Sequence, residues 1–276
     1  MSRLNEMTRE RTRPLLMGIV NVTGDSFSEG ESSAPKTAVS RALALLDDGA
    51  DLLDIGGEST RPGSAVVAEE EEIRRVIPII RELRKLRPTV MLSLDTRKSA
   101  VVRAALEYGV ELINDVSMLR CSPDMAAVVA ASDAALLIAH SRGTPQTMKN
   151  AEFHDYGDDP VTVVVEELAG AKAIALNAGV PEERIWVDPD FGFAKTPEQD
   201  WELLRRIDEL HQLGPVVAGM SRKSFLGGFL AQPDPMRRLG GTVAAALHLA
   251  EREVEILRVH DVRQVGDALR VWEKLR

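Results

Sequence analysis

Eight short apolar segments recur along the chain, and each ends in polar or glycine residues. They occupy residues 15–20, 51–56, 90–95, 111–116, 134–140, 184–189, 215–220 and 255–260. Stretches with the 3.6-residue apolar period of a helix lie between them, at residues 35–48, 69–86, 98–108, 160–178, 196–213, 238–251 and 262–275. Alternating strands and helices predict parallel strand pairing with helical crossovers.

Two folds fit this alternation, a closed (β/α)₈ TIM barrel and an open doubly wound sheet. The length of 276 residues suits a barrel. The barrel is also favoured because polar or ionisable residues end every predicted strand, and in a barrel these ends meet at one mouth. They include Asn21, Glu58, Asp95, Asn114, His140, Asp188 and Arg258. We therefore expect one domain over residues 1–276, with residues 1–14 as a short N-terminal extension.

Composition argues against several classes of protein. Lys and Arg number 34 against 43 Asp and Glu, a net charge of −9, which disfavours binding to nucleic acid or to an acidic membrane surface. No apolar run approaches the ~20 residues that span a bilayer, and none near the start has signal-peptide length. The single cysteine, Cys121, excludes an internal disulfide and fits a reducing compartment, so we expect a cytoplasmic protein.

Two predicted strand-to-helix loops are long and rich in Gly, Ser and Thr. GDSFSEGESSA follows the first strand and GESTRPGSAVV follows the second. Long loops at a barrel mouth commonly close over a ligand, although surface decoration is the alternative.

One side of the predicted mouth is rich in hydrogen-bond acceptors. Asp95, Asn114 and Asp188 end buried strands, where an unsatisfied polar group is costly. Any one of them could cap the following helix, but together they suit a flat nitrogen heterocycle with several N–H donors along one edge. We expect Asp115 to serve as a cap or a loop residue.

The other side of the predicted mouth is basic. Arg222, Lys223 and Ser224 follow the seventh strand, and Arg258 and His260 follow the eighth. Barrels most often bind phosphate at this place. One of the cations could pair with an acidic neighbour, but we do not expect all of them to do so. Removing Arg258 should then hardly change stability.

The candidate residues on both sides of the predicted mouth, and the two long loops, lie in segments that resemble dihydropteroate synthase. The resemblance runs from about residue 15 to residue 262. The segments are MGIVNVTGDSFSEG, DIGGESTRPGS, LSLDTRKS, INDVSML, AHSRGTPQTM, DPDFGFAKTPEQ, GMSRKSFLG, GGTVAAALHLA and RVHDV. The resemblance implies condensation of 6-hydroxymethyl-7,8-dihydropterin pyrophosphate with p-aminobenzoate, with release of pyrophosphate. It also implies a homodimer, a Mg²⁺ cofactor and competition by sulfonamides.

The resemblance implies a role for each matching residue. The pterin ring would be held by Asp95, Asn114, Asp188 and Lys223, with Arg258 stacked on it. Pyrophosphate would meet Asn21, Thr60, Arg258 and His260, with Asn21 also a Mg²⁺ ligand. The p-aminobenzoate site would comprise Thr60, Arg61, Pro62, Phe193, Lys223 and Ser224. The residues expected to act in catalysis are Lys223, Arg258, His260, Phe27 and Glu29.

The chain departs from the family pattern at several positions. Gly24 stands where Pro is usual and should loosen the first loop. Asp190, Ala194 and Glu253 stand where Gly is usual.

Two alternative functions remain, a methyltetrahydrofolate:corrinoid methyltransferase on the same scaffold and a paralogue that binds pterin without turnover. The DSF, STRPG and SRKSF segments disfavour the first, and retention of Asn21, Lys223 and Arg258 disfavours the second.

Overall fold

The computed structural model describes residues 3–22 and 34–276, and its eight parallel strands form a nearly closed barrel. The strands are β1 (Leu15–Asn21), β2 (Leu52–Gly56), β3 (Met91–Asp95), β4 (Leu112–Asp115), β5 (Ala135–Ala139), β6 (Ile185–Asp188), β7 (Val217–Ala218) and β8 (Ile256–Val259). They lie in the order β6-β5-β4-β3-β2-β1-β8-β7, and one bridge from Val187 to Val216 joins the two ends. The predicted barrel is thus confirmed and the open sheet is wrong.

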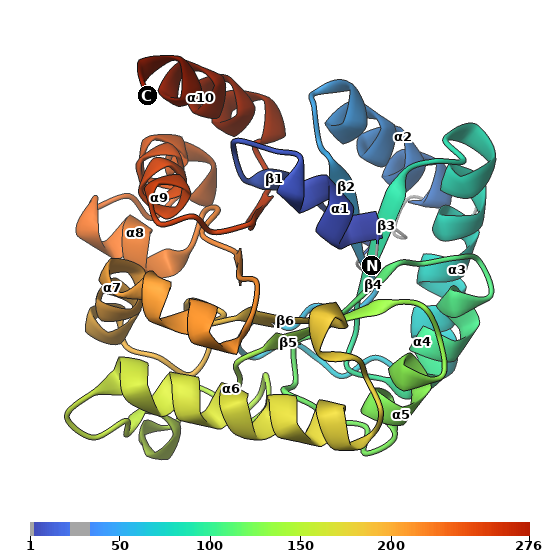
Figure 1. The fold of residues 1–276 in the computed structure, drawn as a ribbon, viewed down its shortest axis with the longest axis horizontal. Coiled ribbons are helices and arrows are strands. Elements are labelled where there is room, and N and C mark those ends of the chain that lie inside the picture. Colours follow the sequence, from blue (N-terminus) through green and yellow to red (C-terminus); the bar gives the residue numbers. More distant parts are fainter. Residues whose placement is uncertain (1–2, 23–33) are drawn as a thin grey trace.

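Helices surround the strands, as Figure 1 shows. They are α1 (Arg3–Arg9), α2 (Ala34–Asp47), α3 (Glu69–Leu86), α4 (Ser99–Leu106), α5 (Met125–Ala130), α6 (Pro160–Asn177), α7 (Pro197–Arg205), α8 (Ser224–Phe229), α9 (Leu239–Glu251) and α10 (Val262–Leu275). The sequence did not predict α1 or α5, because six or seven residues are too few to show a helical period.

The predicted helix over 196–213 is two helices. Thr196 and Gln199 form a capping box that starts α7, as the Thr-Pro pair suggested. The α-helix ends at Arg205, because the next residue, Arg206, has a φ of −112° that leaves the helical region, and a 3₁₀ segment, η4 (Ile207–Leu213), continues the chain. The seventh strand is also shorter than predicted at both ends; at its start, Pro215 cannot donate a backbone hydrogen bond.

The base of the barrel interior is apolar. Inward side chains of the strands form one buried cluster there, including Leu15, Met17, Leu52 and Trp186. Leu4 of α1 belongs to the same cluster and is 1% exposed, and α1 lies across the ends of the strands in Figure 1. The N-terminal segment therefore closes the end of the barrel opposite to the mouth. A second, larger apolar cluster fills the space between strands and helices.

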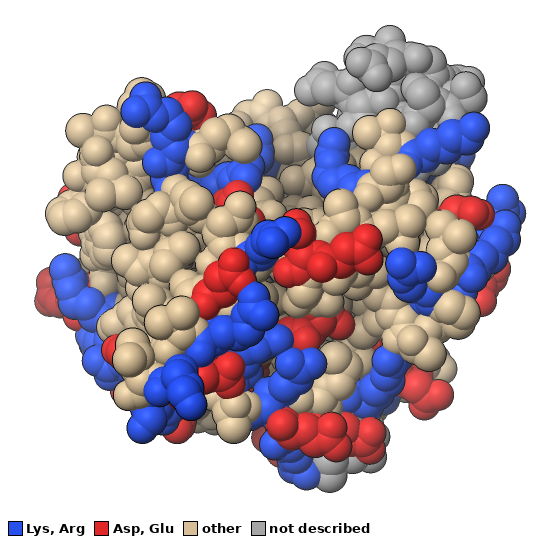
Figure 2. Space-filling view, turned by 90° about the horizontal axis from the view of Figure 1, so that it is seen from above, with Lys and Arg blue, Asp and Glu red and all other residues tan. Residues whose placement is uncertain are grey.

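The surface carries both signs of charge. Basic and acidic side chains are interspersed on the face that Figure 2 shows. Arg270 and Asp267 form one such pair within α10, and Arg263 pairs with Asp48. Within residues 3–22 and 34–276, no helix is long and apolar enough to cross a membrane.

Candidate active site

The upper part of the barrel interior is polar, and Asp54 lies at its centre. Because side chains alternate along a strand, Asp54 of β2 faces the interior as Leu52 does, two residues before it. Its fully buried carboxylate accepts hydrogen bonds from Ser93 Oγ at 2.6 Å, Asn114 Nδ2 at 3.2 Å and Arg258 Nε at 2.6 Å. The sequence analysis missed this residue, although a carboxylate within an apolar strand was the available signal.

At the ends of β3 and β4, two acceptor atoms have no hydrogen-bond partner among the described residues. Asn114 gives its Nδ2 to Asp54, and Asp95 Oδ2 accepts from Arg258 at 2.7 Å. This leaves Asn114 Oδ1 and Asp95 Oδ1 buried and unpaired within the described structure. The two residues are direct neighbours on β3 and β4. Since an unpaired buried acceptor is costly, the pair is suited to receive N–H donors from a bound ring.

Asp188 lies at the end of β6 beside a second carboxylate. Its Oδ1 accepts the Asp190 backbone N–H at 2.7 Å, and Asp190 Oδ1 lies 3.3 Å from Lys223 Nζ. Asp190 Oδ2 is buried without a described partner. Lys223 Nζ also lies 4.5 Å from the centre of the Phe193 ring. Asp188, Lys223 and Phe193, predicted from separate segments, are therefore brought together, and Asp190 adds a negative charge to them.

Burial perturbs the two carboxylates that end β3 and β6. Burial raises the pKa of Asp95 to about 8, although the charge of Arg258 opposes the shift. Burial and the neighbouring Asp190 raise the pKa of Asp188 to about 7, opposed by Lys223 and Arg258. Hydrogen-bond donors on a ligand would favour the ionised forms and lower both values.

All three cations on the basic side pair with carboxylates, contrary to expectation. Arg222 contacts Asp261 at 2.6 Å, Lys223 contacts Asp190, and Arg258 contacts Asp54 and Asp95. The segments at the ends of the strands carry enough carboxylates to pair with all three cations. The spacing of residues along the sequence does not show which carboxylate pairs with which cation. Arg222 is therefore a structural residue here, whereas Lys223 and Arg258 pair with carboxylates of the polar upper part of the barrel.

His260 lies at the mouth with one ring nitrogen held. Its Nδ1 lies 3.0 Å from Ser221 Oγ, which also accepts the His260 backbone N–H. Burial lowers the pKa of His260 to about 3, helped by the charges of Arg222 and Arg258, so the imidazole is neutral at pH 7. If Ser221 donates its hydroxyl proton to Nδ1, then Nε2 carries the N–H and can donate it to an anion.

The loop between β2 and α3 carries Thr60, Arg61 and Pro62, which are partly or fully exposed. Gln146 Nε2 donates to the Ser64 carbonyl at 2.5 Å, which ties this loop to the one after β5. Ser224 is exposed at the first residue of α8. The remaining predicted residues on the first loop, Gly24, Phe27 and Glu29, lie outside the described residues.

Comparison with known proteins places the chain in a family. A family described as "Pterin binding enzyme" matches residues 17–260. The dihydropteroate synthase of Synechocystis sp. is 42% identical over 265 residues, which cover 95% of this chain and 90% of that protein. The chain belongs to the pterin-binding enzymes of the dihydropteroate synthase type.

Solved structures of such pterin-binding enzymes share this fold. Xanthomonas albilineans dihydropteroate synthase with 4-aminobenzoic acid gives a TM-score of 0.87 at 43% identity, covering 95% of this chain and 93% of that one. The Burkholderia cenocepacia enzyme complexed with 7,8-dihydropteroate gives 0.84 at 44% identity, covering 96% and 92%. The Yersinia pestis enzyme with a sulfonamide drug gives 0.88 at 38% identity, covering 96% and 95%.

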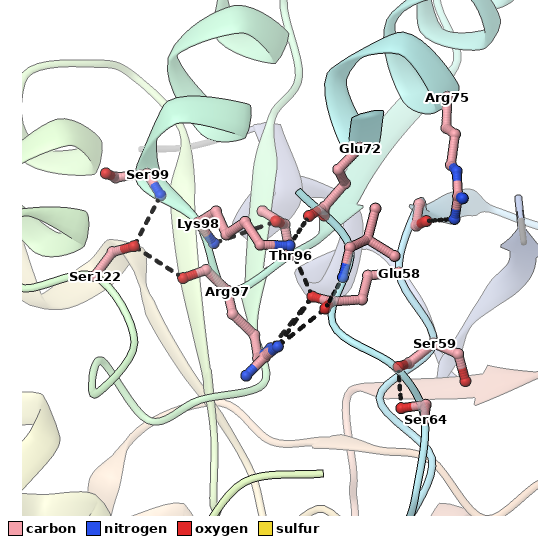
Figure 3. A network of polar contacts seen from close by, with 12 residues as sticks. Glu58, Ser59, Ser64, Glu72, Arg75, Thr96, Arg97, Lys98, Ser99 and Ser122 are labelled. Carbon is pink, nitrogen blue, oxygen red and sulfur yellow. Dashed lines mark hydrogen bonds and ion pairs between the residues drawn. The ribbon is translucent and has the colours of Figure 1, made fainter. Parts of the chain in front are cut away.

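Two residues expected at the mouth of this pterin-binding enzyme point elsewhere. His140 is fully buried on the outer side of the barrel wall, between Glu167 Oε2 at 2.9 Å and Lys195 Nζ at 3.0 Å. Residues after a strand continue its alternation, so His140, next to inward Ala139, faces the helices. Glu58 turns into an ion-pair cluster beside the barrel (Figure 3). Asp115 accepts three hydrogen bonds from residues 117 and 119, and is the loop residue that the sequence predicted.

Lys195 shapes the segment that carries Asp190 and Phe193. Its Nζ donates to the Asp190 carbonyl at 3.3 Å and the Phe193 carbonyl at 3.0 Å. Two non-glycine residues here have positive φ, Asp190 at 46° and Ala194 at 50°. This conformation favours glycine, so both departures from the family pattern occupy strained positions, as does Glu253 at 59°.

Few side chains of the described residues could act as ligands for a metal ion. No group of three or more His, Cys, Asp or Glu side chains in the described part of the chain could hold a metal. Asn21 ends β1 at an inward position and is half-buried. One carboxamide oxygen cannot hold Mg²⁺ alone, but it fits a Mg²⁺ that keeps its waters and arrives on a substrate phosphate.

Proposed function

We propose that this protein condenses 6-hydroxymethyl-7,8-dihydropterin pyrophosphate with p-aminobenzoate to give 7,8-dihydropteroate and pyrophosphate. The observation that carries the proposal is the pair of unpaired buried acceptors, Asn114 Oδ1 and Asp95 Oδ1, beneath the mouth of a barrel. Relatives that are 37–42% identical over 95% of the chain are dihydropteroate synthases.

The pocket suits the pterin ring because it presents acceptors to a donor edge. Asp95, Asn114 and Asp188 would accept ring N–H groups, and Lys223 would donate to a ring acceptor. The guanidinium of Arg258, held in place by two carboxylates, would stack on the ring. A ring lacking these N–H donors would leave the acceptors unpaired and would bind poorly.

Cleavage of the carbon–oxygen bond would leave positive charge on the pterin methylene and add negative charge to the departing pyrophosphate. Arg258 and His260 Nε2 would donate to the pyrophosphate oxygens and stabilise this charge. The neutral aniline nitrogen of p-aminobenzoate would attack the methylene and lose its proton afterwards, so no strong general base is needed. The carboxylates of Asp95 and Asp188 would face the cationic ring.

We also propose that Asn21 ligates a Mg²⁺ bound to the pyrophosphate, which would neutralise charge on the leaving group. Thr60, Arg61, Pro62, Phe193, Lys223 and Ser224 would form the p-aminobenzoate site. The first loop, with Phe27 and Glu29, would complete it and exclude water, which competes for the cation. Sulfonamides, which copy the aniline and the carboxylate of p-aminobenzoate, would compete there.

The test measures pyrophosphate release and dihydropteroate formation by the purified protein with Mg²⁺ and both substrates. We expect both products in equal amounts, and inhibition by a sulfonamide that is competitive with p-aminobenzoate. Pterin binding without product at any p-aminobenzoate concentration would instead identify a binding-only paralogue. Loss of activity with a chelator, restored by Mg²⁺, would support the metal assignment.

We further propose a cytoplasmic homodimer. The single Cys121 fits a reducing compartment. On α10, Trp272 is buried in the core, whereas Val271 and Leu275 are 61% and 81% exposed and are free to contact a second subunit. Sedimentation analysis tests the dimer.

A further inference from the structure

A cluster of four buried ionisable side chains lies beside the ends of β2 and β3 and takes no part in the proposed chemistry (Figure 3). Glu58 accepts from Arg97 at 3.1 Å and from Lys98 Nζ at 2.9 Å, and Lys98 Nζ also contacts Glu72 at 2.5 Å. All four residues are at most 9% exposed. Two acids and two bases make the cluster neutral, so removal of any one of them leaves a buried charge without compensation.

Glu58 is the member that belongs to the loop. Its Oε1 also accepts the backbone N–H of Val67 at 3.0 Å, nine residues further on, and so closes the base of the loop. Burial alone would raise the pKa of Glu58, but the Val67 N–H, Lys98 and Arg97 together hold it below its ordinary value. Glu58 therefore stays ionised and bound at neutral pH.

The exposed segment 60–62 lies between two anchors. Glu58 fixes the chain on one side, and Gly63 fixes it on the other by donating its N–H to the Pro145 carbonyl at 2.7 Å. No residue between them is buried. The conformation of this segment therefore depends on where its two ends are held.

The Glu58 anchor is attached to the strand that carries Asp95. Gly56 of β2 pairs directly with Asp95 of β3, and the cations of the cluster follow Asp95 by two and three residues. The segments that follow β2 and β3 therefore leave the sheet side by side. A Cβ on Gly57 would come within 2.9 Å of Glu72 Cγ, so glycine allows this close approach to α3.

From this arrangement we propose that Glu58, held by Arg97 and Lys98, is a positioning residue for the second substrate. Glu58 fixes the position of segment 60–62 relative to Asp95. The position of this segment in turn determines the affinity for p-aminobenzoate and for sulfonamides. The proposal rests on the proposed function and assigns Glu58 no contact with substrate. Without the anchor, the segment would have to be ordered at the expense of binding energy.

The test compares Glu58→Gln with Glu111→Gln. Glu111 is a matched control, because its carboxylate also accepts one backbone N–H, from Leu92, and pairs with two arginines, Arg3 and Arg84, but at the opposite end of the barrel. Both variants should lose stability. Only Glu58→Gln should raise the KM for p-aminobenzoate and the Ki of a sulfonamide, each about tenfold or more, while the Kd for a dihydropterin without the pyrophosphate, which would not contact Thr60, stays within about twofold.

A second variant guards against a folding defect. In Glu58→Gln, two cations face one remaining carboxylate, and Glu58→Gln combined with Arg97→Gln restores the balance. We expect the double variant to recover stability but not the affinity for p-aminobenzoate, because the charged anchor is still absent. If Glu58→Gln does not fold, the KM for p-aminobenzoate and the Ki of a sulfonamide are measured on the double variant instead.

The outcomes separate this proposal from the proposed function. Wild-type protein that forms no dihydropteroate overturns the function. Active wild type with an unchanged KM for p-aminobenzoate in the Glu58 variants overturns the anchor. Equal loss of pterin and p-aminobenzoate affinity, or a matching loss in Glu111→Gln, also overturns it, because either result would show general damage to the barrel.

Discussion

Replacing Arg258 by Ala should destabilise the protein as well as weaken substrate binding. Arg258 bridges two carboxylates, with Asp54 Oδ2 2.6 Å from its Nε and Asp95 Oδ2 2.7 Å from its Nη2. The side chain of Asp54 is 0% exposed and that of Asp95 is 9% exposed. Removing the guanidinium leaves the buried carboxylate of Asp54 without a cationic partner. The sequence alone suggested a ligand-facing cation whose loss leaves stability unchanged, and the structure contradicts that expectation.

The size of the effect follows from this burial. Breaking a buried ion pair by removing one partner costs about 3–5 kcal/mol. Since the Arg258 side chain is itself 20% exposed, water can enter the space it leaves, and we expect about 3 kcal/mol, at the lower end of that range. Pterin pyrophosphate should also bind roughly ten- to a hundredfold more weakly, because a charge-assisted contact is lost.

Urea unfolding at several pH values measures the effect. The pKa of Asp95 is already raised in the folded state to about 8, from 3.8, so the folded protein holds this proton more tightly than the unfolded chain. Stability from this group is present below about pH 4 and is lost as the pH rises towards 8. Removing Arg258 raises this pKa further, so the deficit should be larger at pH 8 than at pH 5.

The control is Arg263→Ala, whose exposed pair with Asp48 should contribute at most about 1 kcal/mol. A deficit of less than about 1 kcal/mol for Arg258→Ala at pH 8, or one that does not shrink at pH 5, would refute the reasoning.

Three further predictions concern the carboxylates of the pocket. Asp188→Asn turns one acceptor atom into a donor and should cost about 1–3 kcal/mol of pterin binding by calorimetry; near-normal affinity would refute the role. Pterin binding near pH 7 should release protons, because Asp95, with its pKa raised to about 8, gives up its proton when ring N–H groups favour the carboxylate. Calorimetry in two buffers of different ionisation enthalpy measures this release, and identical heats would contradict it. Asp190→Gly should unfold at a higher temperature than Asp190→Ala, because glycine relieves the strain of the positive φ of 46° whereas alanine keeps it; both variants lose the ion pair with Lys223, so equal unfolding temperatures would contradict this account.

Much of the architecture was readable in the sequence because it depends on local pattern. Buried parallel strands are continuous apolar runs, and amphipathic helices repeat every 3.6 residues, so all eight strands and the long helices were predicted near their observed bounds. The α3 and α10 helices were predicted to the residue. The resemblance of the motif segments also indicated the family.

Only the tertiary structure decided which polar residues meet. Strand alternation turns Asp54 into the barrel and His140 out of it, but the sequence does not show which face of a doubly buried strand is inner, because both faces are apolar. The partners of Arg258 lie 163 and 204 residues away along the chain, and closure of the barrel brings them together. Pairing over such distances determines which cations are neutralised and which acceptors remain for a ligand, and for that reason it could not be predicted from the sequence.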